Sequence, residues 1–319
     1  MAAKDLIRES VRAGAVKGWD GFVWMMKIVV PVSLLTTLLD RSGWLARVDF
    51  LLQPAMGLLS LPPEAALPLL IGMLANIYGG IAAMVVLPLT LAQMTLVAIF
   101  LLTAHNLIQE GIIQAKSGLH PLKATLFRIG AATVTVLCVA PFLDPGTATA
   151  APAGGAAEAV RPWIGVVEAW AWTTLRLAVK IFFIIFVIMI LMEILKRTGW
   201  VHTIVKICAP FLRLMGLAPK VGLLWMTAVI FGLAYGGAVI VEETRNGDLS
   251  RAELETLHLS IGINHSMVED PILFMALGMS AFWLYIPRLI MAIVTVRLLN
   301  LWFRLTGPKQ PAAVTPASR

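Results

Sequence analysis

Two short stretches of this 319-residue chain place imidazole, amide and carboxylate side chains inside otherwise apolar sequence. The polar side chains of the first stretch are those of His105, Asn106, Gln109 and Glu110. Those of the second stretch are Asn264, His265, Ser266, Glu269 and Asp270. Imidazoles and carboxylates can bind a proton or hold a cation, and amides and hydroxyls can hydrogen-bond a polar solute. Because ionisable groups are costly at membrane depth, both stretches are candidate binding sites for a substrate or an ion.

The spacing within each stretch predicts how its side chains are arranged. His265 and Glu269 are four residues apart, so a continuous helix would place them on one face, and the first stretch repeats this spacing. A residue that disfavours helix, Pro271 or Gly111, follows the acids directly, so we expect each helix to stop or kink there. Broken helices expose backbone dipoles at the interface between repeats, where many transporters bind polar substrates or ions.

Two arginines leave a structural interpretation open. Arg128 and Arg288 could neutralise the acids of the two stretches as buried charge partners, without any role in binding. The ends of these segments could also lie at the membrane interface, where a charge costs little. The other histidines, His120, His202 and His258, have no second ligand at metal spacing and are interpreted as incidental. No enzymatic activity is expected, because no arrangement of Ser, His and Asp is typical of covalent catalysis.

A second candidate site combines tyrosine with paired glycines. Its residues are Asn76, Tyr78, Gly79 and Gly80 in the first half of the chain and Tyr235, Gly236 and Gly237 in the second half. Two adjacent glycines permit close helix packing or an unwound turn whose carbonyl groups face a cavity. Only three tyrosines occur in the chain and two occupy this equivalent position, so a role in binding and a role in packing both stay open.

These stretches belong to an internal duplication of the chain. The residues that recur at an offset of 160 are His105, Gly118 and Arg128, which correspond to His265, Gly278 and Arg288. The corner from Arg41 to Trp44 recurs as Arg197 to Trp200. Repeated polar and glycine residues in one order do not arise easily by chance in apolar sequence. A duplicated membrane chain is the sequence signature of many secondary transporters.

The composition predicts an all-α polytopic membrane protein. Hydrophobic residues make up 59% of the chain and charged residues 13%, with a mean hydropathy of +0.86, whereas soluble proteins carry about 25% charged residues. The net charge of +7 does not indicate a nucleic-acid partner, because Lys and Arg lie in short loops and at the termini. Cys138 and Cys208 lack metal or disulfide spacing, and no cofactor is expected. The expected partners are the lipid bilayer, a small polar solute or an ion, and a second copy or a membrane partner protein.

The chain is expected to divide into five parts. They are an amphipathic N-terminal helix (1–20), a first membrane repeat (21–143), a flexible link (144–162), a second membrane repeat (163–305) and a disordered tail (306–319). The stretches 45–60 and 201–217 are short for a membrane span, so each either forms a re-entrant hairpin or crosses at a tilt. Either way each repeat crosses an odd number of times, which inverts the second repeat. The distribution of Lys and Arg then places both termini in the cytoplasm. The expected location is the cell inner (plasma) membrane.

The duplicated corner at Arg41–Trp44, the stretch from Asn76 to Gly80 and the paired halves resemble the Gate, or nucleoside recognition, domain family. That family includes spore maturation proteins A and B and the gate regions of the ferrous-iron permease, and it is grouped with concentrative nucleoside transporters. The resemblance implies a membrane fold of two inverted repeats with broken helices or re-entrant hairpins, and a role related to transport.

The leading hypothesis is therefore an inner-membrane secondary transporter that binds a small polar solute, nucleoside-like as a first guess, or an ion between the two repeats. Proton coupling through His265 and Glu269 is part of this hypothesis. One alternative is a membrane scaffold or regulator that does not transport and acts with a partner. Another is a divalent-cation carrier whose ligands are drawn from His105, Glu110, His265, Glu269 and Asp270.

Overall fold

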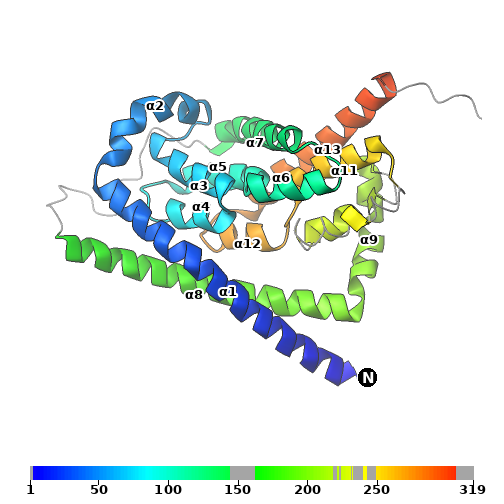
Figure 1. The fold of residues 1–319 in the computed structure, drawn as a ribbon, viewed down its shortest axis with the longest axis horizontal. Helices are drawn as coiled ribbons and strands as arrows, with labels where there is room; N and C mark the ends of the chain where they lie inside the picture. Colours follow the sequence, from blue (N-terminus) through cyan, green and yellow to red (C-terminus); the bar gives the residue numbers. More distant parts are fainter. Residues whose placement is uncertain are drawn as a thin grey trace, which may run out of the picture.

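The computed structural model describes residues 3–143, 162–217, 221–222, 224–230, 232, 240–242 and 249–306. Every regular element in these ranges is helical (Figure 1). The helices of the first half are α1 (Ala3–Arg41), α2 (Trp44–Leu58), the 3-10 turn η1 (Pro63–Ala65), α3 (Ala66–Leu74), α4 (Ile77–Met84), α5 (Leu91–Ala104), α6 (Leu107–Lys116) and α7 (Pro121–Leu143). Those of the second half are α8 (Trp163–Thr198), α9 (Trp200–Met215), α11 (Arg251–Asn264), α12 (Glu269–Met275) and α13 (Ala281–Thr306). The predicted link and tail fall almost wholly outside the described residues.

Within the described residues, five helical segments are long and apolar enough to cross a membrane, which confirms an all-α polytopic membrane protein. They are Asp5–Arg41, Leu91–Lys116, Pro121–Leu143, Trp163–Thr198 and Ala281–Thr306. A sixth candidate combines Phe50–Leu58 with Pro63–Leu74, two pieces that meet at an angle of 84°. This bend is compatible with a re-entrant hairpin and with a broken span, the two arrangements expected for 45–60.

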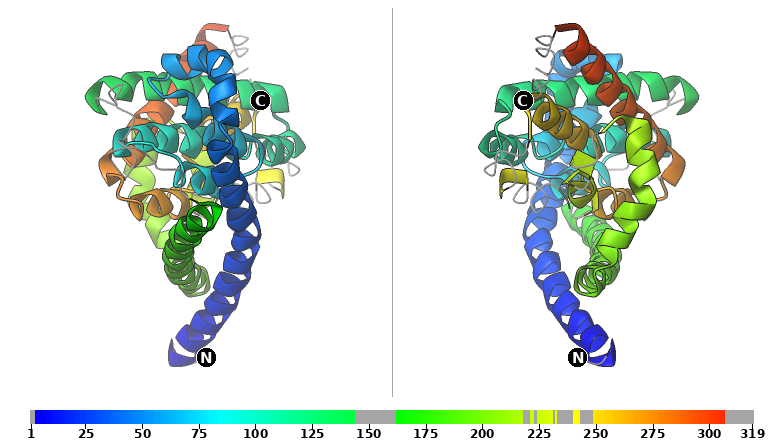
Figure 2. Two further views of the ribbon diagram at one scale, coloured as in Figure 1. Left: turned by 90° about the vertical axis from the view of Figure 1, so that its left-hand side faces the viewer. Right: turned by 90° about the vertical axis from the view of Figure 1, so that its right-hand side faces the viewer.

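The two longest helices, α1 and α8, pack against each other along one side of the molecule and project beyond its body (Figures 1 and 2). Gly14 of α1 makes the approach close, because a Cβ atom at this position would lie 2.5 Å from the Cα atom of Ile190. Lys17 pairs with Glu193 of α8 at 2.6 Å near the same end. The helix α1 continues without a break across residue 20, where the sequence suggested a boundary between an amphipathic helix and the first repeat.

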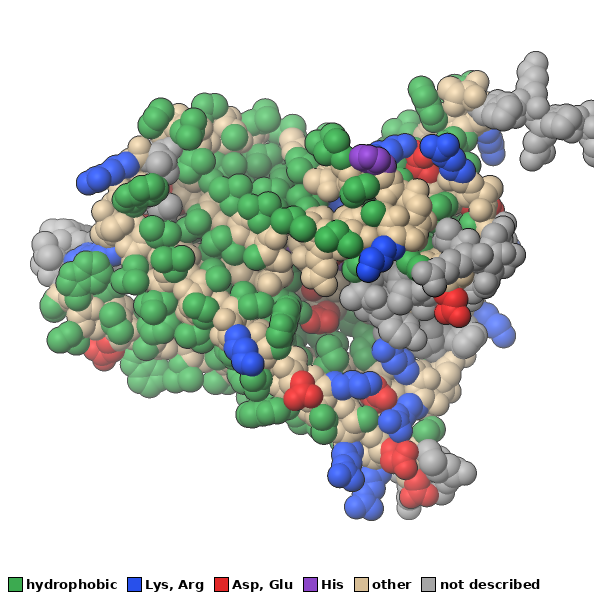
Figure 3. All heavy atoms as spheres, in the orientation of Figure 1, with side chains coloured by type: hydrophobic (Ala, Val, Ile, Leu, Met, Phe, Trp, Pro, Cys, Tyr) green, Lys and Arg blue, Asp and Glu red, His purple; other side chains and the backbone are tan. Residues whose placement is uncertain are grey.

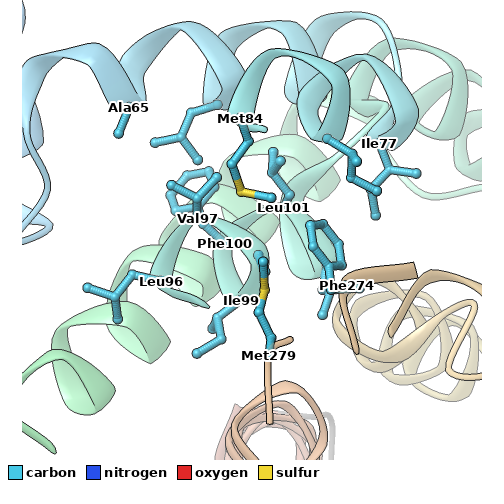
Figure 4. Close-up of a cluster of buried hydrophobic side chains, with 14 of the residues drawn as sticks. Ala65, Ile77, Met84, Leu96, Val97, Ile99, Phe100, Leu101, Phe274 and Met279 are labelled. Carbon is cyan, nitrogen blue, oxygen red and sulfur yellow. The ribbon is translucent and has the colours of Figure 1, made fainter. Parts of the chain in front are cut away.

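A buried central helix, α5, forms the middle of the main hydrophobic core. Its residues Leu96, Val97, Ile99 and Leu101 are fully buried although they point in different directions around the helix, and an all-round apolar helix is expected in such a position. Figure 4 shows the side chains of Met84, Phe274 and Met279 pointing toward α5 from three sides. On the face shown in Figure 3, hydrophobic side chains cover most of the body, while charged side chains gather around the N-terminal end of α1. A broad apolar surface of this kind is what contact with lipid requires.

Among the described helices, three of the short breaks lie at the candidate site segments, as the broken-helix prediction required. α3 is followed by α4, α5 by α6, and α11 by α12. The breaks come before the acids, however, and not after them as predicted. Pro271 lies in the first turn of α12, where its missing N–H group costs no hydrogen bond, and Gly111 lies within α6. The predicted common helical face of His265 and Glu269 is therefore wrong, because these residues belong to different helices.

Positions that match in the duplicated sequence also share unusual backbone conformations. Left-handed φ angles are found at the pairs Gly43 and Gly199 (68° and 70°), Asn106 and Ser266 (50° and 51°), and Gly118 and Gly278 (97° and 100°). Asn and Ser adopt this conformation far less easily than Gly, so its recurrence at the two helix breaks is a specific structural match. The inverted arrangement of the two repeats in a membrane remains a prediction.

Candidate functional site

The breaks after α5 and α11 bring two histidines from different halves of the chain into contact. The ring centroids of His105 and His265 are 4.8 Å apart, and their Nε2 atoms are separated by 3.3 Å. The residues are 5% and 1% exposed, so the contact is closed to solvent in this conformation. Residues 160 positions apart in the sequence thus meet in the buried interior.

Two buried carboxylates surround this histidine pair. Glu110 Oε1 lies 3.4 Å from His105 Nε2 and 3.2 Å from His265 Nε2. Asp270 Oδ2 lies 3.6 Å from His105 Nε2. We refer to His105, Glu110, His265 and Asp270 as the central cluster, to which each half of the chain contributes one histidine and one carboxylate.

Each arginine donates hydrogen bonds to carbonyl groups that a helix break leaves without helical partners. Arg128 donates from Nε to the carbonyl oxygen of Thr103 and from Nη2 to that of His105, at 2.9 and 2.8 Å. These carbonyl groups lie at the end of α5, where no further helical N–H group is available to them. The Nη1 atom of Arg128 also pairs with Glu110 Oε2 at 2.5 Å. Arg128 therefore joins the end of α5 to the central cluster.

Arg288 repeats the same contacts at the end of α11. It donates to the carbonyl oxygens of Ile263 and His265, which are the equivalents of Thr103 and His105 at an offset of 160. Its Nη2 atom also donates to the carbonyl oxygen of Leu102 at 2.8 Å, which connects the two halves. Its Nη1 atom has no hydrogen-bond partner among the described residues. The two arginines thus cap equivalent helices, but only Arg128 makes a close ion pair with an acid of the cluster.

The backbone determines the tautomer of both histidines. His105 Nδ1 lies 2.8 Å from the carbonyl oxygen of Leu101, and His265 Nδ1 lies 3.3 Å from that of Ile261. A carbonyl oxygen only accepts hydrogen bonds, so each Nδ1 atom carries a proton. In the neutral rings both Nε2 atoms are then acceptors, and they face each other and the two carboxylates.

Glu269 lies apart from the central cluster and pairs with the second candidate site. The hydroxyl group of Tyr78 donates to Glu269 Oε1 at 2.5 Å, which joins α4 of the first half to α12 of the second. Both residues are half-buried, and the ring of Trp24 packs edge-on against Tyr78 with centroids 6.2 Å apart. The two candidate sites predicted from the sequence therefore meet through this contact.

The remaining first-half residues of the second site are structural in this conformation. Asn76 caps α4 by accepting a hydrogen bond from the N–H group of Gly79 at 2.9 Å. Gly79 and Gly80 are buried, and an added Cβ atom would lie 2.7 Å from Ile71 or 2.6 Å from Leu101. The glycine pair thus allows close packing of α4. Tyr235, Gly236 and Gly237 lie outside the described residues.

The other predicted site residues lie at the breaks themselves. Asn106 and Ser266 provide the left-handed turns, and the Asn106 side chain donates to the exposed Gln109 at 3.2 Å. Asn264, next to His265, is fully buried, and neither atom of its amide group has a hydrogen-bond partner among the described residues. An unpaired buried polar group costs about 1–3 kcal/mol and calls for a water molecule or a ligand.

A second group of buried polar residues was missed in the sequence. Ser117 Oγ lies 2.9 Å from His258 Nε2, and Gln114 donates to the backbone carbonyl oxygen of His258 at 3.2 Å. Gln114 and Ser117 continue the face of α6 that carries Glu110, while His258 lies two turns before His265 on α11. The periodic spacing of polar residues on these two segments was the signal that could have identified this group.

Comparison with known proteins supports a membrane family. Residues 22–116 match the Gate family model, which is described as nucleoside recognition. The chain is 31% identical over 309 residues to a protein of Bacillus subtilis (strain 168) named "Uncharacterized membrane protein YvoD". This match covers 95% of the present chain and 96% of YvoD. No solved structure matches. The chain belongs, together with YvoD, to the Gate (nucleoside recognition) family of membrane proteins.

Proposed function

We propose that this protein is an ion-coupled secondary transporter that binds a small polar solute together with a cation between its two halves. The observation that carries this proposal is the central cluster, in which the broken helices of both halves bring two histidines and two carboxylates together. Buried ionisable groups in membrane proteins mark substrate and ion pathways, and broken helices at a repeat interface are a common way to form them.

The charges at the centre favour a cation as one occupant. With all three acids ionised, Glu110, Glu269 and Asp270 carry three negative charges, while Arg128 and Arg288 carry two positive charges. With neutral histidines the sum is −1, and this residual charge is held mostly in buried side chains. A proton or a metal ion would reduce the electrostatic cost of burying these groups.

A polar solute is supported by the unpaired groups beside the cluster. Asn264 offers both an N–H donor and a carbonyl acceptor, and Arg288 Nη1 offers a further donor. A nucleobase edge presents donors and acceptors side by side, which agrees with the description of the Gate family. Because the cluster is closed to solvent here, binding and release require a movement of the helices that cover it.

The proposal is tested by uptake into liposomes that contain the purified protein. Radiolabelled nucleosides, nucleobases and small amides are offered under a proton gradient, a metal-ion gradient or no gradient. We expect gradient-dependent uptake that Asn264→Leu abolishes, while His120→Gln, at an exposed position outside the site, leaves it unchanged. Absence of any flux from folded protein, together with stoichiometric co-purification of a membrane partner, would instead support the scaffold hypothesis.

A further inference from the structure

With neutral imidazoles and ionised carboxylates, the central cluster contains four hydrogen-bond acceptors that face one another without a donor between them. His105 Nε2 and His265 Nε2 are acceptors because the Nδ1 atoms hold the protons, and Glu110 Oε1 and Asp270 Oδ2 are carboxylate oxygens. Glu110 uses its other oxygen, Oε2, to pair with Arg128. Four lone pairs that converge in a buried space repel one another unless a positive charge lies among them. The arrangement therefore requires either a proton on one of these groups or a bound metal ion.

We infer that this cation is a divalent transition-metal ion, bound by His105 Nε2, His265 Nε2 and Asp270 Oδ2, with Glu110 Oε1 as the fourth ligand. The inference deepens the proposed function and rests on it for the role of the ion as the coupling cation. The ligands come from both halves of the chain, so the ion would join α5–α6 to α11–α12. Glu269, by contrast, is occupied by Tyr78 and is not a ligand.

Four of the six distances between these ligand atoms fit a tetrahedral site. Bonds of about 2.0–2.2 Å, as formed by zinc with His and carboxylate ligands, place the ligand atoms about 3.3–3.6 Å apart. The two Nε2 atoms are 3.3 Å apart, and His105 Nε2 lies 3.6 Å from Asp270 Oδ2. Glu110 Oε1 lies 3.4 and 3.2 Å from the two Nε2 atoms. Ligand atoms of His105, His265 and Asp270 all lie within 4.8 Å of one another, so Asp270 would move closer to His265 when the ion binds.

The surroundings of the cluster also fit a metal site. Metal-bound histidines usually donate their other ring N–H group to a carbonyl or carboxylate oxygen, and here Leu101 and Ile261 provide such carbonyl oxygens. Arg128 similarly orients Glu110 by pairing with its second carboxylate oxygen, Oε2. Two imidazoles with two carboxylates select zinc, cobalt or ferrous iron over magnesium and calcium, which prefer oxygen ligands alone.

The test is metal binding by the purified full-length protein in detergent, after treatment with a chelator. Co(II) is the probe, because four-coordinate Co(II) absorbs visible light far more strongly than six-coordinate Co(II). We expect one Co(II) per chain with the four-coordinate spectrum, displaced by Zn(II) and not by Mg(II). His265→Gln and Asp270→Asn should each weaken binding at least about 100-fold. His258→Gln is the matched control, since it replaces a buried histidine of the same helix outside the cluster.

Two results would overturn the inference. One is that the unsubstituted protein binds Co(II) no more tightly than the His265→Gln variant does, in which case the cluster holds a proton only. The other is a six-coordinate spectrum, which indicates adventitious binding and decides the question even where a variant fails to fold. Because binding is measured without transport, the two proposals fail separately. Solute uptake by a protein without four-coordinate Co(II) binding refutes the metal ion and leaves the transporter standing, whereas four-coordinate Co(II) in a protein without flux does the reverse.

Discussion

Replacement of Arg128 by methionine should destabilise the protein chiefly because it leaves Glu110 buried without its charge partner. The side chains of the pair are 2% and 7% exposed, and the Nη1–Oε2 distance is 2.5 Å. Removal of one member of a buried ion pair costs about 3–5 kcal/mol. Loss of the hydrogen bonds to the carbonyl oxygens of Thr103 and His105 adds to this cost.

The ion pair can be separated from the capping hydrogen bonds by a double-mutant cycle. Glu110→Gln in the Arg128→Met background removes the stranded charge, so we expect it to restore part of the stability, with a coupling energy of about 2–3 kcal/mol. Arg288→Met is the matched comparison, because Arg288 caps α11 through equivalent carbonyl groups. No acid lies within 4.0 Å of Arg288 in the part of the chain that the structure covers, so Glu110→Gln should not rescue Arg288→Met.

The cycle is measured by SDS titration of the protein in mixed micelles, with helix content followed by circular dichroism and a chelator present throughout. The ion pair of Lys123 with Glu255 is a control, because the Lys123 side chain is 50% exposed and such pairs contribute at most about 1 kcal/mol. Equal coupling of Glu110 to Arg128 and to Arg288, or effects of Arg128→Met and Glu110→Gln that simply add, would refute the assignment of Arg128 as the partner of Glu110.

Three further substitutions test other contacts. Gly14→Leu should destabilise the packing of α1 on α8 by about 1–3 kcal/mol, because its Cβ atom would meet the backbone of α8. Gly130 has open space around it, so the control variant Gly130→Leu should be tolerated. Equal thermal stability of the two variants would contradict this prediction. Tyr78→Phe removes the hydrogen bond to Glu269 and should cost about 1–3 kcal/mol in the same SDS titration; an unchanged midpoint would show that the contact contributes nothing. Asn264→Leu should leave the stability of the unloaded protein equal or higher, since it removes an unpaired buried amide, and a clear loss of stability would reveal a partner for that amide.

The members of the central cluster could be identified from the sequence, but their pairing could not. Histidines and carboxylates are rare in apolar segments, and the duplication predicted a binding site between the two repeats. Glu269 and Asp270 are adjacent, however, and only the turn between α11 and α12 decides which of them faces the histidines. That turn depends on a left-handed conformation at Ser266, which residue spacing does not reveal.

The position of the helix breaks shows a second feature that could not be predicted from the sequence. Pro271 was interpreted as the end of a helix, yet proline is equally suited to a first helical turn, where the structure places it. His258 was interpreted as incidental because no ligand lies near it along the chain. Its partner Ser117 is 141 residues away, so the contact depends on how α6 packs against α11. The helical class and the membrane character, by contrast, follow directly from composition.

The division of the central cluster between the two halves has a consequence for how such a protein could arise. Each half supplies one histidine, one carboxylate and one arginine, so a half-length chain could complete the cluster only by associating with another half-length chain. In an ancestral dimer of identical chains, both partners would have to contribute the same side chains to the cluster. Fusion of two copies into one chain removes that restriction and fixes the ratio of unlike halves at one to one. The difference between Glu110, which pairs with an arginine, and Asp270, which does not, is a specialisation that a dimer of identical chains could not maintain.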